Sequence, residues 1–272
     1  MPRPLSRKKR IVYFSIFVLF FIVAIPVLLL YSSGYSLDNN ALTLSWRGGI
    51  YVYVPQTAAS VYIGNDLKEV TSLFKKEVIV KNLRPDNYLV LVSHDDFWPW
   101  AKFVDVKRGE VAARYPLLVP KIIPFVEIAR GSTTPYTEAR ALFTPVVSRG
   151  AATTTLSSKN IRLWVENDMV RASWLGSEEA RPYYFCVGYS ASQCPKDIAI
   201  YQSAGPIRAI DFYPDRDDAL LLTVGSSIYA TEIDPMTYRN SYPIFRGTKP
   251  EVKVSRGSVY IKDGDYIASA EF

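Results

Sequence analysis

The sequence predicts a mainly β protein with one N-terminal transmembrane helix. Three observations favour this class: an uncharged apolar run over residues 11–31, short Val-, Ile- and Tyr-rich segments separated by Gly and Pro, and no long helical periodicity after the run. β-Branched and aromatic residues favour strands, and turn residues separate them. About 240 residues follow the run, enough for one large or two modest domains with buried cores.

The run over residues 11–31 is long enough to cross a membrane as a helix. At ~1.5 Å per residue, about 20 apolar residues span the ~30 Å hydrocarbon core. Residues 1–10 hold five Lys and Arg and no acidic residue. The positive-inside bias therefore predicts a cytoplasmic basic tail and an extracytoplasmic C-terminal region on a single-pass protein of the cytoplasmic membrane. A cleaved signal peptide is the alternative, but Ser32 and Gly34 offer only a poor small-x-small cleavage site.

Most of the net charge of the chain lies beside the apolar run and indicates its orientation in the membrane. Five of the six net positive charges lie in the basic tail, which leaves +1 for the rest. A nucleic-acid surface needs a clustered basic stripe, so we expect no nucleic-acid partner. Membrane lipids are the expected partner of residues 11–31, and the tail can contact anionic head groups.

Residues 32–48 are predicted to form a spacer, in which Leu42, Leu44 and Trp46 alternate as in a strand. Dense strand signals follow over residues 49–120. Phe103, Asp105 and Lys107 alternate there with Val104 and Val106, as expected for a strand with one wet face. The predicted strands cover residues 50–54, 60–64, 77–83, 88–94, 100–106 and 110–118. So many short strands with turns between them indicate a small β-sandwich.

Four segments within residues 49–120 match the pattern of one known domain family. Residues 55–58 (PQTA) stand where that family has its Pro-Glu-Gly-Ala tetrapeptide, and residues 61–64 (VYIG) and 83–88 (LRPDNY) are similar to its V-Y-I-D-G and L-x-P-G-x-Y segments. Residues 97–100 (FWPW) match its aromatic pair before a strand. On these segments, residues 49–120 resemble a PEGA domain. The resemblance implies a β-sandwich of bacterial and archaeal envelope proteins, with a binding or structural role and no catalytic residues.

Residues 121–159, rich in Ser, Thr, Gly and Pro, are predicted to be a linker. Residues 122–128 are its best strand candidate, and Phe125, Leu142 and Phe143 are expected to pack on a neighbouring domain. Residues 160–272 are predicted to be a second β-domain. It begins with a hairpin over residues 161–176 that turns at Asn167-Asp168, and two strand trios follow over residues 206–235 and 251–272.

Strand trios recurring at ~40-residue spacing are typical of propeller blades. Residues 207–234 are similar to a WD40- or TolB-type blade. Only two or three blades are predicted, whereas a closed propeller needs at least four. The alternatives are a partial propeller, which we favour, an open sandwich, or a ring completed by several chains.

Cys186 and Cys194 are the only cysteines. Outside the cytoplasm they could close a small disulfide loop, and two unpaired thiols packed as small hydrophobes are the alternative. A metal site is not expected, because no His or second Cys pair lies nearby.

Phe97, Trp98 and Trp100 are the candidate binding residues. Aromatic side chains on a loop can stack on sugars or anchor a protein partner, which makes envelope polysaccharide or another envelope protein the candidate ligand. The alternative is that they cover the end of the sandwich.

No catalytic residue, metal site or cofactor is predicted. His94 lacks the further ligands or nucleophile that metal binding or catalysis needs. The acidic turn with Asp211, Asp215, Asp217 and Asp218 lacks the spacing of a calcium loop. No phosphate loop or nucleophile elbow occurs.

The sequence therefore predicts a non-enzymatic, membrane-anchored envelope protein that displays β-domains outside the cytoplasmic membrane for binding, adhesion or scaffolding. The alternative is a sensory or assembly subunit of a larger membrane complex.

Overall fold

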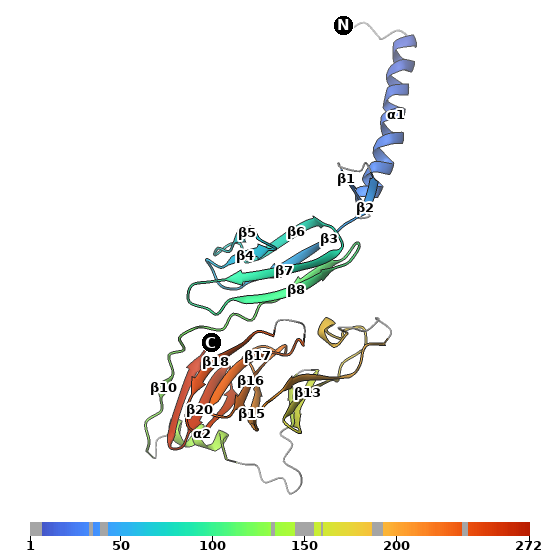
Figure 1. Ribbon diagram of the computed structural model, residues 1–272. Helices are drawn as coiled ribbons and strands as arrows, with labels where there is room; N and C mark the ends of the chain where they lie inside the picture. Colours follow the sequence, from blue (N-terminus) through green and yellow to red (C-terminus); the bar gives the residue numbers. More distant parts are fainter. Residues whose placement is uncertain are drawn as a thin grey trace. The chain divides into compact units, whose positions relative to one another are not determined.

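The computed structural model describes residues 7–32, 35–38, 43–131, 134–144, 155–158, 160–186, 193–235 and 239–272. These residues form one long apolar helix near the N-terminus and several antiparallel sheets, which confirms the predicted mainly β class (Figure 1). The chain divides into two units. Unit 1 holds Met1–Leu89 and Val104–Tyr115, and unit 2 holds Val90–Phe103 and Pro116–Phe272. This division differs from the predicted domains, because residues 90–103 belong with the C-terminal strands.

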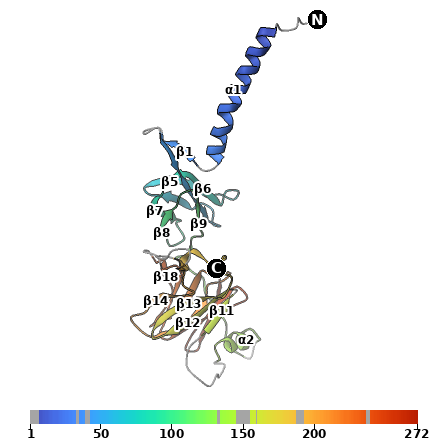
Figure 2. The same cartoon turned by 90° about the vertical axis from the view of Figure 1, so that its right-hand side faces the viewer.

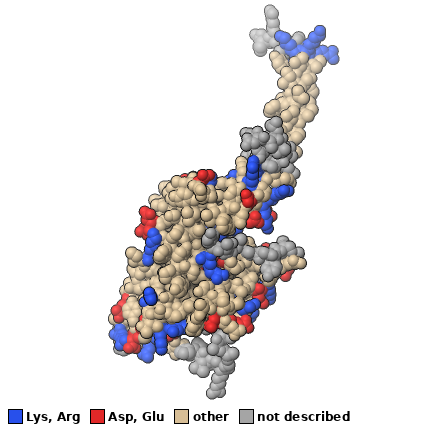
Figure 3. All heavy atoms as spheres, viewed as in Figure 1, with Lys and Arg blue, Asp and Glu red and all other residues tan. Residues whose placement is uncertain are grey.

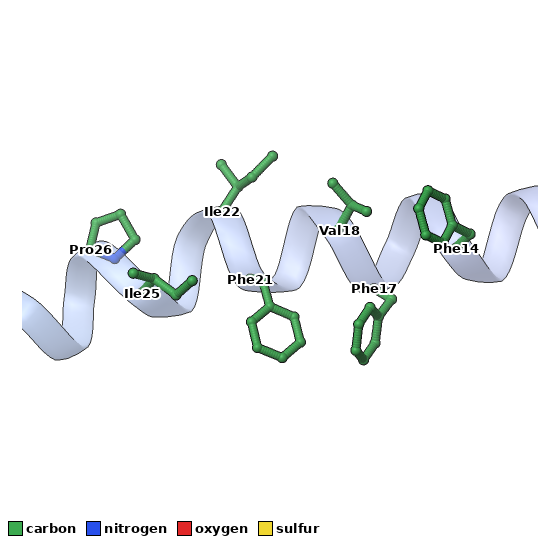
Figure 4. Close-up of a pocket in the computed structure, with 7 residues that line it drawn as sticks. All are labelled: Phe14, Phe17, Val18, Phe21, Ile22, Ile25 and Pro26. Atoms are coloured by element: carbon green, nitrogen blue, oxygen red, sulfur yellow. The ribbon is translucent and has the colours of Figure 1, made fainter.

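Helix α1 (Arg7–Ser32) contains the apolar run. Its apolar side chains are exposed; Phe14 and Leu28, for example, are 68% and 65% exposed. Figure 4 shows Phe14, Phe17 and Phe21 extending from the helix with no other element of the chain beside them. Pro26 lies inside the helix, a position that spanning helices tolerate.

A short hairpin follows α1. Strand β1 (Tyr35–Asp38) pairs antiparallel with β2 (Thr43–Trp46), and Tyr35 lies opposite Trp46. The predicted spacer therefore doubles back on itself instead of extending.

Two sheets, of order β6-β3-β9 and β5-β4-β7-β8, supply the strands of unit 1, and β3 and β9 are parallel. Their strands are β3 (Gly48–Tyr53), β4 (Ser60–Ile63), β5 (Asp66–Val70), β6 (Glu77–Leu83), β7 (Asp86–Ser93), β8 (Trp100–Val106) and β9 (Val111–Arg114). Residues 90–93 of β7 and 100–103 of β8 belong to unit 2. Alternate residues are buried: Ile50 and Val52 on one sheet, Val104 and Val106 on the other. Asp105 faces solvent, which confirms the predicted alternation of β8.

Unit 2 contains three four-stranded sheets among its described residues (Figures 1 and 2). The first, of order β11-β12-β13-β14, consists of Thr155–Ser158, Ile161–Glu166, Met169–Trp174 and Asp197–Gln202. The second, of order β15-β16-β17-β18, consists of Ile207–Phe212, Ala219–Val224, Ser227–Glu232 and Ser241–Arg246. Both are antiparallel meanders, as in propeller blades.

The third sheet is assembled from distant parts of the chain. Strands β19 (Pro250–Ser255), β20 (Ser258–Asp263) and β21 (Tyr266–Glu271) form the predicted trio. The fourth strand, β10 (Val126–Glu127), comes from the predicted linker and pairs with β21, Val126 opposite Ser269. The described part of the linker is therefore integrated into unit 2.

Helix α2 (Thr134–Leu142) is a second element of the predicted linker, and it contacts β21. Ala139 and Phe143 are buried, and the Lys262 ammonium lies 5.9 Å from the Phe143 ring centre. Phe125 meets Phe245 edge to face at 5.8 Å. The packing predicted for Phe125 and Phe143 is confirmed. The helix was not predicted, because nine residues give too little 3.6-residue periodicity to recognise.

The first two sheets share one hydrophobic core. Leu163, Ala172 and Ile200 of the first sheet pack in one buried cluster with Ile210 and Leu222 of the second. The hairpin turn is at Asn167-Asp168 as predicted, with φ of 51° and 57°, values typical of the turns that match strand twist. Strand β15 lies at the edge of the second sheet and contacts β11 of the first sheet and β19 of the third. The described residues of unit 2 form three four-stranded sheets, and these do not show a closed propeller.

Asp211 links the second sheet to the third. Its Oδ2 accepts a hydrogen bond from the Val254 backbone N–H at 2.9 Å, and its Oδ1 accepts one from Phe212 at 2.8 Å. Burial raises the pKa of the Asp211 carboxyl, although these backbone bonds act to lower it. Keeping the buried Asp211 carboxylate charged therefore costs folding free energy.

We expect Asp211→Ala to destabilise unit 2 by about 1–3 kcal/mol, because the Val254 N–H loses its partner. Asp211→Asn keeps an acceptor and should cost less. Because the folded pKa is raised above its unfolded value, wild type should gain stability relative to Asp211→Asn as the pH falls towards 4. Denaturant unfolding of the three proteins between neutral and acidic pH measures both effects, and a pH-independent difference between wild type and Asp211→Asn would contradict the second.

Candidate functional site

A buried polar cluster of unit 2 surrounds Lys102 of β8 (Trp100–Val106). The Lys102 ammonium lies 2.7 Å from Glu232 Oε2 and 3.2 Å from Asp234 Oδ2. The three side chains are 1%, 7% and 6% exposed. Glu232 ends β17 and Asp234 follows two residues later. A buried charge costs several kcal/mol unless it is paired, and here one cation serves two carboxylates.

Neutral groups complete the cluster. The Trp100 indole N–H donates to Glu232 Oε1, and the Asn240 amide donates to Glu232 Oε2 at 2.9 Å. Asn240 also exchanges two 3.1 Å hydrogen bonds with the backbone of Ala101. The Tyr183 hydroxyl donates to Asp234 Oδ2 at 2.6 Å. Both carboxylates are thus bonded by several donors, the arrangement that a buried network needs.

The local field is negative. Burial, then the charges of Asp218, Asp217 and Asp234, raise the pKa of Tyr184. Burial, then the Glu232 charge, raise the pKa of Tyr242 to about 12. Both phenols therefore remain neutral at physiological pH, and the Tyr242 hydroxyl donates to Asn240 Oδ1 at 3.0 Å.

The geometry favours a structural role for this cluster. Residues 90–103, the end of the β7–β8 hairpin, are held against β17 and β18 by one ion-pair network and by side chain–backbone bonds on both sides. The charged atoms are enclosed and are bonded to one another. General acid–base or nucleophilic catalysis needs a group within reach of a substrate, which this arrangement does not offer.

The three aromatic residues predicted to bind a ligand occupy different environments. Trp100 is 2% exposed and belongs to the Lys102 cluster, so its predicted role on a binding loop is wrong. Trp98 is half-buried and stacks on Tyr242, with ring centres 5.6 Å apart and planes 4° apart. Phe97 is half-buried and pairs with Pro120 through the backbone. Ligand binding by Phe97 and Trp98 stays a prediction.

Cys186 and Cys194 form a disulfide, with Cα atoms 4.5 Å apart. Cys186 follows the 3₁₀ turn η1 (Tyr183–Phe185), which carries the Asp234 donor Tyr183. The predicted loop closure is therefore present, and Cys186 lies three residues after Tyr183, a member of the Lys102 cluster.

The remaining acidic and histidine candidates have structural partners. His94 Nδ1 accepts the Asp96 backbone N–H at 3.0 Å. In the acidic turn, Asp218 pairs with Arg216 through two 2.7 Å hydrogen bonds, and Arg216 also donates to the Pro116 carbonyl at 2.9 Å. Among the described residues, no group of three or more His, Cys, Asp or Glu could hold a metal ion.

One signal in the sequence could have predicted that Lys102 is buried. Trp100, Lys102, Val104 and Val106 share one face of β8 by the two-residue period, so Lys102 falls on the buried face. A buried lysine needs an acidic partner. Its partners lie 130 and 132 positions away, and nothing local in the sequence identifies them.

Comparisons with known proteins do not identify the chain. Neither a protein-family model nor a curated protein matches it. Among solved structures, it is similar to a crystal structure from Bacteroides fragilis NCTC 9343, of a protein of unknown function whose assignment as membrane-associated is provisional. The two are 15% identical, the match covers 75% of this chain and 100% of that chain, and the TM-score is 0.20. At that score the likeness carries no argument about this chain.

We expect Glu232→Ala to destabilise unit 2 by about 3 kcal/mol or more, because the buried donors of Lys102, Trp100 and Asn240 lose a shared acceptor even though Asp234 still pairs with the ammonium. Glu251→Ala is the matched control. Glu251 pairs with Lys262 on the surface at 3.3 Å, and its loss should cost at most about 1 kcal/mol. Denaturant unfolding followed by hydrogen exchange of residues 90–103 measures the difference. Equal effects of the two substitutions would contradict the role given to the cluster.

Proposed function

We propose that the chain is a non-enzymatic, single-pass membrane protein that displays its two β-rich units outside the cytoplasmic membrane for binding, adhesion or scaffolding. The observation that carries this proposal is helix α1. It has 26 residues, and the 23-residue segment Arg7–Leu29 is apolar enough to cross a membrane and is not buried in the described chain.

Apolar residues surround α1 on all sides. In Figure 3 its length is free of red and blue atoms except at its basic beginning. A helix that is apolar all round belongs in a core or a membrane. Each large aliphatic or aromatic side chain left in water forgoes ~1.5–3 kcal/mol, and α1 carries more than a dozen of them. A bilayer covers this surface, and acyl chains fill the hollow between Phe14, Phe21 and Ile25 (Figure 4).

The basic residues at the start of α1 support the orientation. Arg7, Lys8, Lys9 and Arg10 form its first turn, with no acidic residue among them. Cations flanking a spanning helix favour the cytoplasmic side, so the β-rich units lie outside.

The non-enzymatic role is supported by the closed Lys102 cluster and by the PEGA resemblance of residues 49–120. The family's role is taken to be binding or structural. We therefore propose unit 1 as a PEGA-like module and the three sheets of unit 2 as a partial propeller.

Topology and retention of α1 can be tested together in spheroplasts of a bacterial host. The two native cysteines are bonded, so one introduced cysteine can be labelled alone. We expect Asn65→Cys, in an exposed turn of unit 1, to react fully with a membrane-impermeant maleimide in intact spheroplasts. Ser6→Cys should react only after lysis.

The intact mass of the protein extracted from the membrane provides the control for cleavage. A mass lacking the first 32 or more residues, with release of the β-rich part, would establish a cleaved signal peptide and overturn the anchor. Reaction of Ser6→Cys before lysis would reverse the orientation.

A second candidate function, a subunit of a larger membrane complex, is favoured by the turn between β5 and β6. Ser72 and Lys75 exchange backbone hydrogen bonds across it, and the two residues at its tip, Leu73 and Phe74, are 75% and 100% exposed. Two large apolar side chains on a tight turn are suited to a partner's apolar pocket.

We expect Leu73→Ser/Phe74→Ser to lower the yield of a discrete cross-linked complex in native membranes severalfold. The protein's own stability should change by no more than about 0.5 kcal/mol, because both side chains are exposed. Leu67→Ser, at a 52% exposed position on β5, is the control. An unchanged yield in the double variant would remove this surface from consideration.

A further inference from the structure

We propose that the end of unit 1 that begins β3 docks on anionic phospholipid head groups of the membrane that holds α1. This proposal rests on the anchor proposed above and extends it, because it assigns a second, non-spanning membrane contact. The surface consists of Arg47, Lys81, Arg84, Lys107 and Arg108, called the basic end below.

Chain connectivity keeps the basic end close to the bilayer. From Ser32, the last residue of α1, three residues lead to Tyr35, which lies opposite Trp46 in the β1–β2 hairpin. Trp46 is two residues from Gly48, the start of β3. Fully extended steps and a ladder spacing of ~5 Å put Gly48 at most about 24 Å from Ser32. Without the hairpin, sixteen extended residues would reach more than twice as far.

Three chain segments meet at the basic end. Gly48 pairs with Leu83 at the end of β6, and the turn after Leu83 carries Arg84. The turn between β8 and β9 carries Lys107 and Arg108. Two backbone hydrogen bonds of 3.0 Å join this turn to the start of β3. The Gly109 N–H donates to the Arg47 carbonyl, and the Gly49 N–H donates to the Glu110 carbonyl. A hollow of about 650 Å³ lies between these two turns.

The charge of the basic end suits phosphate. Lys81, Arg84, Lys107 and Arg108 are exposed, and Arg47 is half-buried. Three carboxylates, Asp86, Asp105 and Glu110, lie among these five cations, which leaves a net charge of +2. The opposite end of β3, where Tyr53 pairs with Glu77, has no net charge. In the adjoining turn, Lys75 and Lys76 are balanced by Glu69 and Glu77. Lys75 and Glu69 form an ion pair.

Trp46 favours a lipid surface over other polyanions as the ligand of the basic end. It is 40% exposed, its ring lies against Gly109, and it is therefore presented beside the cations Lys107 and Arg108. Tryptophan is enriched at the membrane–water interface, where its ring sits at head-group depth. A basic surface with an interfacial tryptophan, tethered to a spanning helix, matches an anionic bilayer.

The test uses the full-length chain in nanodiscs of phosphatidylcholine, with or without phosphatidylglycerol. A fluorophore is attached through Asn87→Cys, an exposed residue that lines the hollow at the basic end. Lipids that carry a quencher on the head group report whether this end touches the bilayer. We expect strong quenching with phosphatidylglycerol, little without it, and loss of quenching at high salt.

The variant Lys107→Gln/Arg108→Gln should abolish most of the quenching. Each cation near an anionic surface changes the docked-to-undocked ratio about fivefold, so two change it roughly 30-fold. Lys75→Gln/Lys76→Gln removes the same charge from the opposite end and should quench like the parent.

Several outcomes overturn the proposal. Equal quenching in the two lipid mixtures, or quenching that Lys107→Gln/Arg108→Gln leaves intact, would refute docking on anionic lipid. The proposal would also be refuted if the label stayed unquenched and the same cations bound a soluble acidic polysaccharide. That result would identify a glycopolymer as the ligand. Failure of the labelled chain to co-elute with the discs would instead refute the anchor itself.

Discussion

The ion pair between Lys102 and Glu232 is the constraint on which the organisation of the chain depends. Strand β8 continues from residues of unit 2 into residues of unit 1, and the pair lies at its unit 2 end. A buried ammonium without a carboxylate partner costs several kcal/mol, and Glu232 and Asp234 offset that cost here. Lys102 therefore fixes residues 90–103 within unit 2, and β8 cannot be assigned to one domain.

The same interaction explains why the aromatic residues beside it have different roles. Trp100 satisfies a carboxylate oxygen that the lysine leaves available, and Trp98 stacks on the tyrosine next to the cluster. An aromatic-rich loop such as FWPW predicts ligand binding because large rings on a loop are costly without a partner. In this protein the partner of Trp100 is another part of the same unit.

The sequence predicted the central strands, and it missed several edge strands while finding others such as β6, β9 and β19. The alternation Val104, Val106 and the Asn167-Asp168 turn are local signals, and both were found. Strands β5, β11, β14 and β18 were missed, and each lies at a sheet edge. An edge strand has one neighbour and a weaker apolar pattern, so it tolerates residues such as Pro243 in β18 that argue against a strand. The Lys102 cluster could be only half anticipated, because burial of Lys102 follows from periodicity whereas its partners lie far along the chain.

The pairing of β10 with β21 fixes the order in which unit 2 can be completed. Val126 emerges from the ribosome about 140 residues before Ser269, its partner in the ladder. At ~5–20 residues per second, β10 waits roughly 7–30 s for β21 to be synthesised. The third sheet thus closes only after β21 has been synthesised. Until then β10 and the other strands of that sheet expose unpaired backbone, which makes this interval the period when the protein is most open to misassembly or to a chaperone.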